Sequence, residues 1–327
     1  MKICHYTTNT NHEPRLGLIE GTTVIDPNFV WQAVYKKEGF YNVIERAFHK
    51  APTLLSEYLK YKNDPLEELR LTLEIYHNFQ KSGIEVKTTK LADVRLGKPI
   101  DKITTYRDFF SHEKHVKIGF EKRGEPVPPE WYDLPVYYKG STANFIGPEE
   151  EILWPSFTNK LDYELELAVV MARDCYNIKE KDVFKNLLGF TILNDISARD
   201  IQKAEMKVRL GPSKGKDFCS VIGPVIVTVD EFGYKEPNLL MTAKINGTEW
   251  SKGQSGDAHF SFAQMLTFAG RDEWLLAGDL FGSGTVGTGC GLELDQWIKP
   301  GDSLELHIDK IGTLKNKVGP MREKFQI

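Results

Sequence analysis

The 327-residue sequence has few cysteines, no long apolar run and no excess of positive charge. The four cysteines are Cys4, Cys175, Cys219 and Cys290. They are widely spaced and form no CxxC pair, so we expect incidental thiols in a reducing compartment and no zinc ligand among them. Lys plus Arg number 42 against 46 Asp plus Glu, and this balance argues against nucleic acid as a partner.

No uninterrupted apolar stretch approaches the roughly 18 residues that a membrane helix needs, so we expect no membrane partner. Residues 1–6 lack the apolar core of a secretion signal, and we therefore expect a cytoplasmic protein. What the sequence does have is a 41% share of hydrophobic residues and enough length for about two domains. We therefore expect a folded, globular protein.

Residues 1–90 are predicted to form a small N-terminal domain of strands followed by helices. Short strands are expected at 2–6, 15–19 and 22–25, and a helical pattern extends from 29 to 80. The clearest helix begins at Pro65, because Asp64 can cap it and Glu67 stands at the capping-box position. We find no catalytic constellation in this part and expect it to serve packing and orientation.

Residues 91–327 are strand-rich, with apolar runs separated by Gly, Pro and Asp turns. Buried strands are expected at 165–172, 189–193, 225–229 and 304–308. Short helical stretches are expected at 179–184, 198–206 and 262–269, each too short to be the crossover of a regular parallel sheet. The predicted fold class is therefore α+β and mainly β.

Three acidic residues in these strands suggest a metal site. Glu164 and Glu166 alternate with leucines and so project from one face of a strand, and Asp195 follows the apolar run 189–193. Clustered carboxylates repel one another unless a cation lies among them, and a purely oxygen ligand set favours Mg²⁺, Ca²⁺ or Mn²⁺ over zinc. The alternative is a strand with a solvated acidic face.

Two other patterns leave alternatives open. The run GSGTVG at 282–287 satisfies GxGxxG, but no helix is expected after it, so a nicotinamide or flavin cofactor is disfavoured. His112 and His115 stand three residues apart and could bind zinc, supply a general base or form a surface pair. Serine-nucleophile and phosphate-loop motifs are missing from the sequence.

Seven short motifs together resemble the fumarylacetoacetate hydrolase family in identity and order. They are YRDF (106–109), YKGS (138–141), DYELE (162–166), NDISARDIQ (194–202), GKDF (215–218), GP (223–224) and GSGT (282–285). The resemblance spans about residues 91–318, and the combination is far more specific than any single motif.

This resemblance implies a catalytic domain built as a mixed β-sandwich roll, forming a homodimer and holding one divalent cation, with Mg²⁺ expected first. The metal ligands it implies are Asp108, Glu164, Glu166 and Asp195. It also implies that His115, seven residues after Asp108, is the water-activating base, and that Glu293 pairs with it. Lys216 is the third catalytic residue carried over.

The substrate-binding residues implied by the resemblance are Gln202, Tyr138, Thr285 and Arg123. Two positions depart from the family pattern. Ile118 stands where smaller members carry the acid of a His-x-x-Glu dyad, so the acid must come from elsewhere. Met206 stands where the namesake hydrolase has a pocket tyrosine, which disfavours fumarylacetoacetate itself as the substrate. We assign Arg199 and Asp200 to structural roles.

The function predicted from this set is metal-dependent hydrolysis of a carbon–carbon bond in a β-diketone acid, such as an acylpyruvate or a fumarylacetoacetate-like compound. One alternative keeps the metal site but has a 2-oxo acid decarboxylase, hydratase or tautomerase acting through a metal-bound enolate. The other is a catalytically silent, metal-stabilised dimer. The sequence does not separate hydrolysis from the other enolate reactions.

Overall fold

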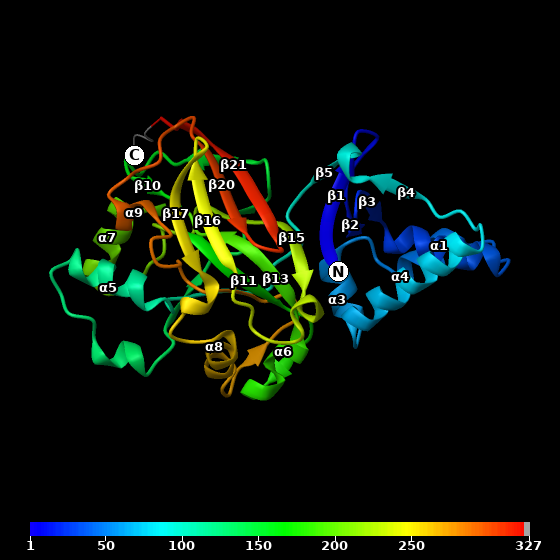
Figure 1. Cartoon of the computed structure of the whole chain (residues 1–327), viewed down its shortest axis with the longest axis horizontal. Coiled ribbons are helices and arrows are strands. Elements are labelled where there is room, and N and C mark those ends of the chain that lie inside the picture. Colours follow the sequence, from blue (N-terminus) through cyan, green and yellow to red (C-terminus); the bar gives the residue numbers. More distant parts are fainter. Residues whose placement is uncertain (324–327) are drawn as a thin grey trace.

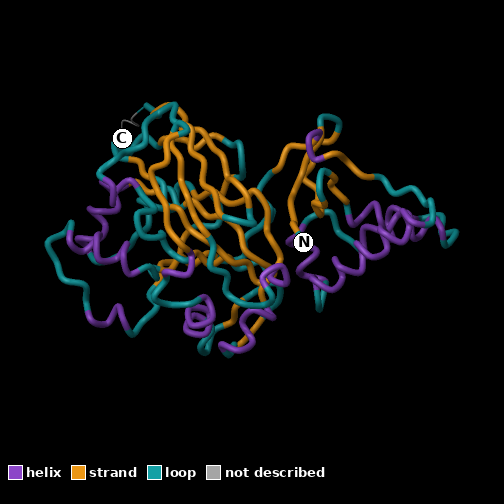
Figure 2. The backbone as a smooth tube through the Cα atoms, viewed as in Figure 1, coloured by secondary structure: helices purple, strands orange, loops and turns teal. Residues whose placement is uncertain are grey.

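The computed structural model describes residues 1–323. A smaller unit at the N-terminal end, blue to cyan in Figure 1, lies beside a larger part that holds most of the strands. Figure 2 shows that strands fill the middle of the larger part, while most of its helices lie toward the periphery. None of the helices described is long and apolar enough to cross a membrane.

The N-terminal unit combines short strands with a group of helices. Its strands are β1 (Lys2–Thr8), β2 (Asn11–Glu20), β3 (Thr23–Ile25), β4 (Thr88–Lys90) and β5 (Val94–Leu96). Its helices are α1 (Pro27–Lys37), α2 (Val43–Lys50), α3 (Leu55–Tyr61) and α4 (Pro65–Lys81). The strand-then-helix order expected from the sequence is present.

Helix α4 begins as its first residues predict. The Asp64 side chain accepts a hydrogen bond from the Glu67 backbone N–H, and Pro65 occupies the first turn, where its missing N–H costs nothing. The buried face includes Leu66, Leu69, Leu73 and Tyr76. This apolar stripe fixes the helix against the rest of the unit.

A twelve-stranded sheet runs through both parts of the molecule. Its remaining strands are β6 (Tyr106–Phe109), β7 (Tyr137–Gly140), β8 (Phe145–Ile146), β11 (Leu165–Met171), β13 (Leu187–Asn194), β15 (Ser220–Thr228) and β19 (Leu280–Gly282). The main order is β4-β3-β2-β1-β15-β13-β11-β19-β6-β7. Strand β1 pairs with β15 at Ile3 and Ile226, so the N-terminal unit extends the sheet of the larger part.

A second sheet packs against the first and gives the predicted sandwich-like architecture. It contains β9 (Glu151–Trp154), β16 (Leu240–Ile245), β17 (Thr248–Gln254), β20 (Ser303–Ile308) and β21 (Gly312–Met321). Strand β15 contacts β21, and β13 contacts β20, so one hydrophobic core fills the space between the sheets. Figure 1 shows β16, β17, β20 and β21 in front of β11 and β13. The α+β, mainly β fold class is confirmed.

Smaller elements complete the larger part. Its helices are α5 (Glu113–Glu121), α6 (Val183–Asn186), α7 (Arg199–Val208), α8 (Phe262–Ala269) and α9 (Gly291–Leu294). Two short strand pairs are β10 (Leu161–Asp162) with β14 (Ser197–Ala198), and β12 (Cys175–Tyr176) with β18 (Trp274–Leu275). Helix α5 was not predicted, and its N-cap residue His112 makes no capping hydrogen bond.

Candidate active site

Four carboxylates that lie far apart in the sequence meet in the interior of the larger part. Asp108 belongs to β6, Glu164 stands directly before β11, Glu166 lies within β11, and Asp195 directly follows β13. Each offers an oxygen, and these four oxygens lie within 4.8 Å of one another. All four residues are buried. The structure therefore brings together the whole ligand set implied by the family resemblance.

The strand order explains this convergence. Strand β11 lies between β13 and β19, and β6 runs parallel to β19 with Asp108 beside Gly282. A Cβ atom at Gly282 would lie 2.3 Å from Asp108 Oδ1 and 2.8 Å from Glu166 Oε2, so only glycine leaves room for the two carboxylates. The Gly284 N–H donates to both, at 3.2 and 3.1 Å. The glycine-rich run thus serves the carboxylate cluster.

The alternative of a solvated acidic face is wrong for this strand. Glu164 is 4% exposed and Glu166 is fully buried, because β11 is covered on both faces and all of its residues are buried. Burial without compensation is costly for a carboxylate, so the counter-charges around the cluster decide what it can bind.

Two cations contact one side of the cluster. The Lys216 ammonium contacts both Glu164 and Asp195, and the Arg199 guanidinium donates to Glu164 at 2.7 Å. Burial opposes ionisation of Glu164, but Arg199, Lys216 and His115 outweigh it and hold the pKa of Glu164 well below its usual range. This side of the cluster is electrostatically satisfied.

The other side is compensated less, because Lys216 lowers the pKa of Asp108 without outweighing its burial. Among the residues described, no cationic side chain forms an ion pair with Asp108 or Glu166. Burial raises the pKa of both carboxyls well above the usual range, and repulsion from Asp195 adds to this at Asp108, as repulsion from Asp108 does at Glu166. A divalent cation would neutralise these two charges, and an all-oxygen donor set suits a hard ion. The residues present therefore fit the metal that the family resemblance implies.

His115 and Glu293 form a hydrogen-bonded dyad. His115 lies on α5 and Glu293 on α9, and the His115 Nδ1 atom contacts Glu293 Oε1. The second Glu293 oxygen accepts the Thr288 backbone N–H at 2.5 Å, which fixes the carboxylate. With Nδ1 directed to Glu293, Nε2 is the nitrogen available to take a proton.

The dyad lies next to the carboxylate cluster. Cys290, three residues before Glu293, forms an isolated β-bridge with Glu164, and the Coulomb interaction of His115 lowers the pKa of Glu164. The His115–Glu293 dyad and the four candidate metal ligands thus belong to one site.

Of the predicted substrate-binding residues, three contact the site and one does not. Tyr138 OH donates to Asp195 at 2.6 Å, Thr285 Oγ1 to Glu166 at 3.3 Å, and Gln202 accepts from Arg199 at 3.0 Å. Arg123 is 46% exposed, lies over the Phe120 ring and is 3.6 Å from Glu125. Arg123 lies beyond the end of α5 on the surface, and no contact joins it to the cluster.

The interpretation of His112 and His115 as a surface pair is wrong, because both side chains are buried. His112 lies at the start of α5, and neither of its ring nitrogens has a hydrogen-bond partner among the described residues. Burial, followed by repulsion from His115, lowers the pKa of His112 to about 3, so its ring is neutral.

One site residue received no role in the sequence analysis. Asp162 is fully buried and accepts from the Gly291 and Leu292 N–H groups at 2.8 and 2.9 Å, which anchors the start of the helix that carries Glu293. It also accepts from Arg199 Nε at 2.8 Å, so the structural role expected for Arg199 takes the form of a shared ion pair. The signal in the sequence was an acid two residues before the ExE pattern.

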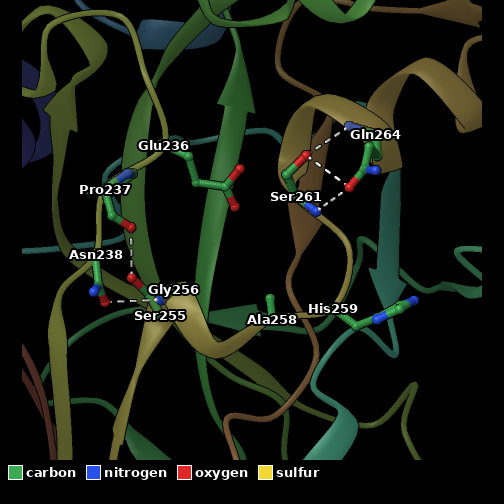
Figure 3. Close-up of a pocket in the computed structure, with 9 residues that line it drawn as sticks. All are labelled: Glu236, Pro237, Asn238, Ser255, Gly256, Ala258, His259, Ser261 and Gln264. Carbon is green, nitrogen blue, oxygen red and sulfur yellow. Dashed lines mark hydrogen bonds between the residues drawn. The ribbon is translucent and has the colours of Figure 1, made fainter.

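A separate hollow of about 280 Å³ lies around the start of α8 (Figure 3). No predicted site residue lines it. Glu236 accepts the Phe262 N–H, and Ser261 with Gln264 forms a capping box. Burial raises the pKa of Glu236 to about 7, against the opposing effect of the Phe262 N–H. These side chains stabilise the N-terminus of α8.

Comparison with known proteins supports the family resemblance. Residues 103–319 match the family model described as fumarylacetoacetate (FAA) hydrolase C-terminal. The oxaloacetate tautomerase YisK of Bacillus subtilis is 31% identical over 70% of this chain and 74% of its own. The 2,4-didehydro-3-deoxy-L-rhamnonate hydrolase of a Sphingomonas strain is also 31% identical, over 60% and 68%. A fumarylacetoacetate hydrolase structure from Exiguobacterium antarcticum covers 98% of this chain and 100% of its own, with a TM-score of 0.69 and 22% identity, and supports the fold.

Proposed function

Because the chain belongs to the fumarylacetoacetate hydrolase family, we propose that it hydrolyses a carbon–carbon bond in a small β-diketone acid, such as an acylpyruvate. The observation that carries the proposal is the His115–Glu293 dyad beside four buried carboxylates. A dyad of this kind provides a base for water, and the named relatives include a hydrolase.

The carboxylates would hold a divalent cation, with Mg²⁺ expected before Ca²⁺ or Mn²⁺. When bound, such an ion supplies Lewis-acid polarisation of substrate oxygens. The chain's own part is to hold Asp108, Glu164, Glu166 and Asp195 in a dry cradle, in which Gly284 and Tyr138 orient individual carboxylate oxygens.

In the proposed reaction, His115 Nε2 takes a proton from water while Glu293 holds the opposite side of the ring. The hydroxide adds to one carbonyl carbon of the substrate. The bond to the neighbouring carbon then breaks, and its electron pair leaves as an enolate. The proton on His115 returns to that carbon, so water is divided between the two fragments.

Lys216 is proposed to support the same step through its charge. Its ammonium is buried, and although burial opposes the charged form, Asp195 and Glu164 raise its pKa above the usual value. It is therefore charged at neutral pH and adds positive potential where the enolate oxygen would develop. Gln202 and Thr285 are the neutral donors we propose for the substrate's remaining oxygens.

The test is a set of acylpyruvates, fumarylpyruvate and oxaloacetate, assayed after metal removal and again with Mg²⁺ or Mn²⁺ restored. We expect metal-dependent cleavage into two organic fragments, and a loss of roughly 10² to 10⁴-fold for His115→Ala. The matched control is His12→Ala, which removes an exposed histidine of β2 and should leave the rate unchanged. Full cleavage by a metal-loaded His115→Ala variant would contradict the assignment.

A second candidate is tautomerisation of a 2-oxo acid such as oxaloacetate, which the similarity to YisK favours. The same base would move a proton between carbon and oxygen without adding water. Product analysis separates the two: hydrolysis gives two fragments, whereas tautomerisation gives one product of unchanged mass that exchanges hydrogen with deuterated solvent. A protein inactive on every compound with added Mg²⁺ would instead favour the silent dimer.

A further inference from the structure

A buried thiol stands beside the dyad and has no part in the proposed reaction. Cys290 Sγ lies 3.6 Å from Glu293 Oε1, and donor atoms of His115, Cys290 and Glu293 all lie within 4.8 Å of one another. The cysteine and the histidine are 175 positions apart in the chain, so residue spacing gave no sign of this cluster.

We propose that His115, Cys290 and Glu293 form a second, inhibitory metal site that takes Zn²⁺ or a similar borderline-soft divalent ion. The inhibitory part rests on the proposed function, because it assumes that His115 is the base. The site is distinct in chemistry from the four-carboxylate cluster, which offers oxygen alone.

The donor types suit zinc. Imidazole nitrogen, thiolate and carboxylate are the three protein ligands that zinc uses, and three of them with one open position is the arrangement of an accessible zinc site. Ligand bonds of the usual length place two donors of a tetrahedral zinc about 3.5 Å apart. The 3.6 Å between Cys290 Sγ and Glu293 Oε1 matches this edge, whereas the hydrogen bond between His115 Nδ1 and Glu293 Oε1 must open to admit the ion.

The surroundings also favour a cation. Burial raises the pKa of the Cys290 thiol well above its usual range, and the nearby Asp162 and Glu164 add to this shift while Arg199 opposes it. The thiol is therefore protonated until a metal arrives, and binding releases one proton to solvent as the S–H bond is replaced by a metal–sulfur bond. The carboxylate of Glu293, which opposes a bare thiolate, would become a ligand of the bound dication.

Binding at this site would stop the base. A metal on Nδ1 of His115 displaces the proton from that nitrogen, and the neutral ring then carries its proton on Nε2. An Nε2 that already holds a proton cannot accept one from water. Glu293 is drawn to the metal at the same time and no longer orients the ring. Inhibition therefore needs no blockage of the carboxylate cluster.

The experiment uses the full chain with excess Mg²⁺, which occupies the hard-ion cluster, and adds Co²⁺ as a spectroscopic substitute for zinc. We expect a thiolate-to-cobalt charge-transfer band in the wild type and its loss in Cys290→Ser. The matched control is Cys175→Ser, which removes a partly exposed thiol in β12 and should keep the band. Glu293→Gln, which retains the thiol, should weaken Co²⁺ binding by at least about tenfold.

The activity arm adds Zn²⁺ to the Mg²⁺-supported enzyme. The half-inhibiting zinc concentration should rise by at least about tenfold in Cys290→Ser relative to wild type, each measured against its own zinc-free rate. Absence of the cobalt band in the wild type, or its persistence in Cys290→Ser, overturns the site. If the band behaves as expected but no substrate is turned over, the metal site stands and the proposed function fails.

Discussion

A buried acid of the N-terminal unit and two buried acids of the larger part differ in how their charge is compensated. In the N-terminal unit, buried Asp26 accepts from Arg15 Nε at 2.6 Å, from Tyr6 OH at 2.9 Å and from the Asn28 N–H at 2.8 Å. In the larger part, Asp108 and Glu166 are equally buried but have no cationic partner among the described residues.

This difference distinguishes carboxylates that stabilise the fold from carboxylates that are available to bind a ligand. A buried carboxylate with a cation and two further donors is satisfied by the fold itself, whereas uncompensated neighbours raise each other's pKa and favour any cation that can reach them. Burial of an acid therefore indicates function only after its partners have been counted.

The largest expected effect comes from Glu166→Gln. Loss of one candidate ligand should lower kcat/KM by at least about a thousandfold, because Lewis-acid stabilisation is worth several kcal/mol. The rise in melting temperature on adding Mg²⁺ should disappear as well. In the presence of a metal chelator, the variant should melt at or above the wild-type temperature, because only one of the two carboxylates without an ion pair, Asp108, then remains.

The matched control for Glu166→Gln is Glu305→Gln, which removes a carboxylate from the surface pair with Lys315. It should keep both the rate and the Mg²⁺-induced shift. A Glu166→Gln protein that melts below the wild type in chelator would mean that the carboxylate is structural, as Asp26 is.

The next effect is expected from Asp26→Asn. Breaking this buried ion pair leaves Arg15 without its partner and should lower the free energy of unfolding by about 3 kcal/mol, with catalysis by the folded protein unchanged. Denaturant unfolding measures the change. Glu67→Gln, which alters the exposed pair with Arg70, should cost less than about 1 kcal/mol. A large loss of activity in folded Asp26→Asn would break the contrast between the two regions.

The last expected effect depends on pH and concerns His5, which is buried in the N-terminal unit and accepts the Leu55 N–H at Nε2. Burial lowers its pKa to about 4. Below its ordinary pKa of about 6.5 the unfolded chain takes up a proton that the folded chain refuses. The stabilisation is thus complete above that pH and is lost as the pH falls toward 4.

His5→Gln should remove up to about 1.4 kcal/mol per pH unit from the slope of unfolding free energy against pH in that window. The exposed His49 provides the comparison variant, His49→Gln, which should leave the slope as in the wild type. Unfolding curves between pH 7 and about 4 measure it. Parallel slopes for wild type and His5→Gln would show that protonation of His5 does not govern acid stability.

Much of the fold could be predicted because its signals are local. The cap at Asp64, the apolar face of α4 and the apolar run of β13 each lie within one segment, and the helix expected at 262–269 is α8. Helix α5 was missed because its packing partner, α9, lies far along the chain. The 90/91 domain boundary, the homodimer and the cytoplasmic location stay predictions.

The candidate site, like the fold, could be predicted from the sequence only in part. The order of motifs identified Asp108, Glu164, Glu166 and Asp195 as a set, but not that Asp108 and Glu166 lack counter-charges. Burial of His112 and Asp162 could not be read from their neighbours in sequence, since the groups around them come from other elements. Arg123 shows the reverse: the family resemblance implied a substrate contact, but the fold leaves this side chain on the surface.

By itself, the sequence determined the family and the class of fold, and it nominated the four acids and the histidine of the candidate site, because motifs and apolar periodicity can be recognised along the chain. Only the tertiary structure decided which charges are compensated and that Cys290 lies beside His115 and Glu293. The physical reason is that electrostatic energy depends on distance and burial, and both are set by strands and helices that meet from distant parts of the chain.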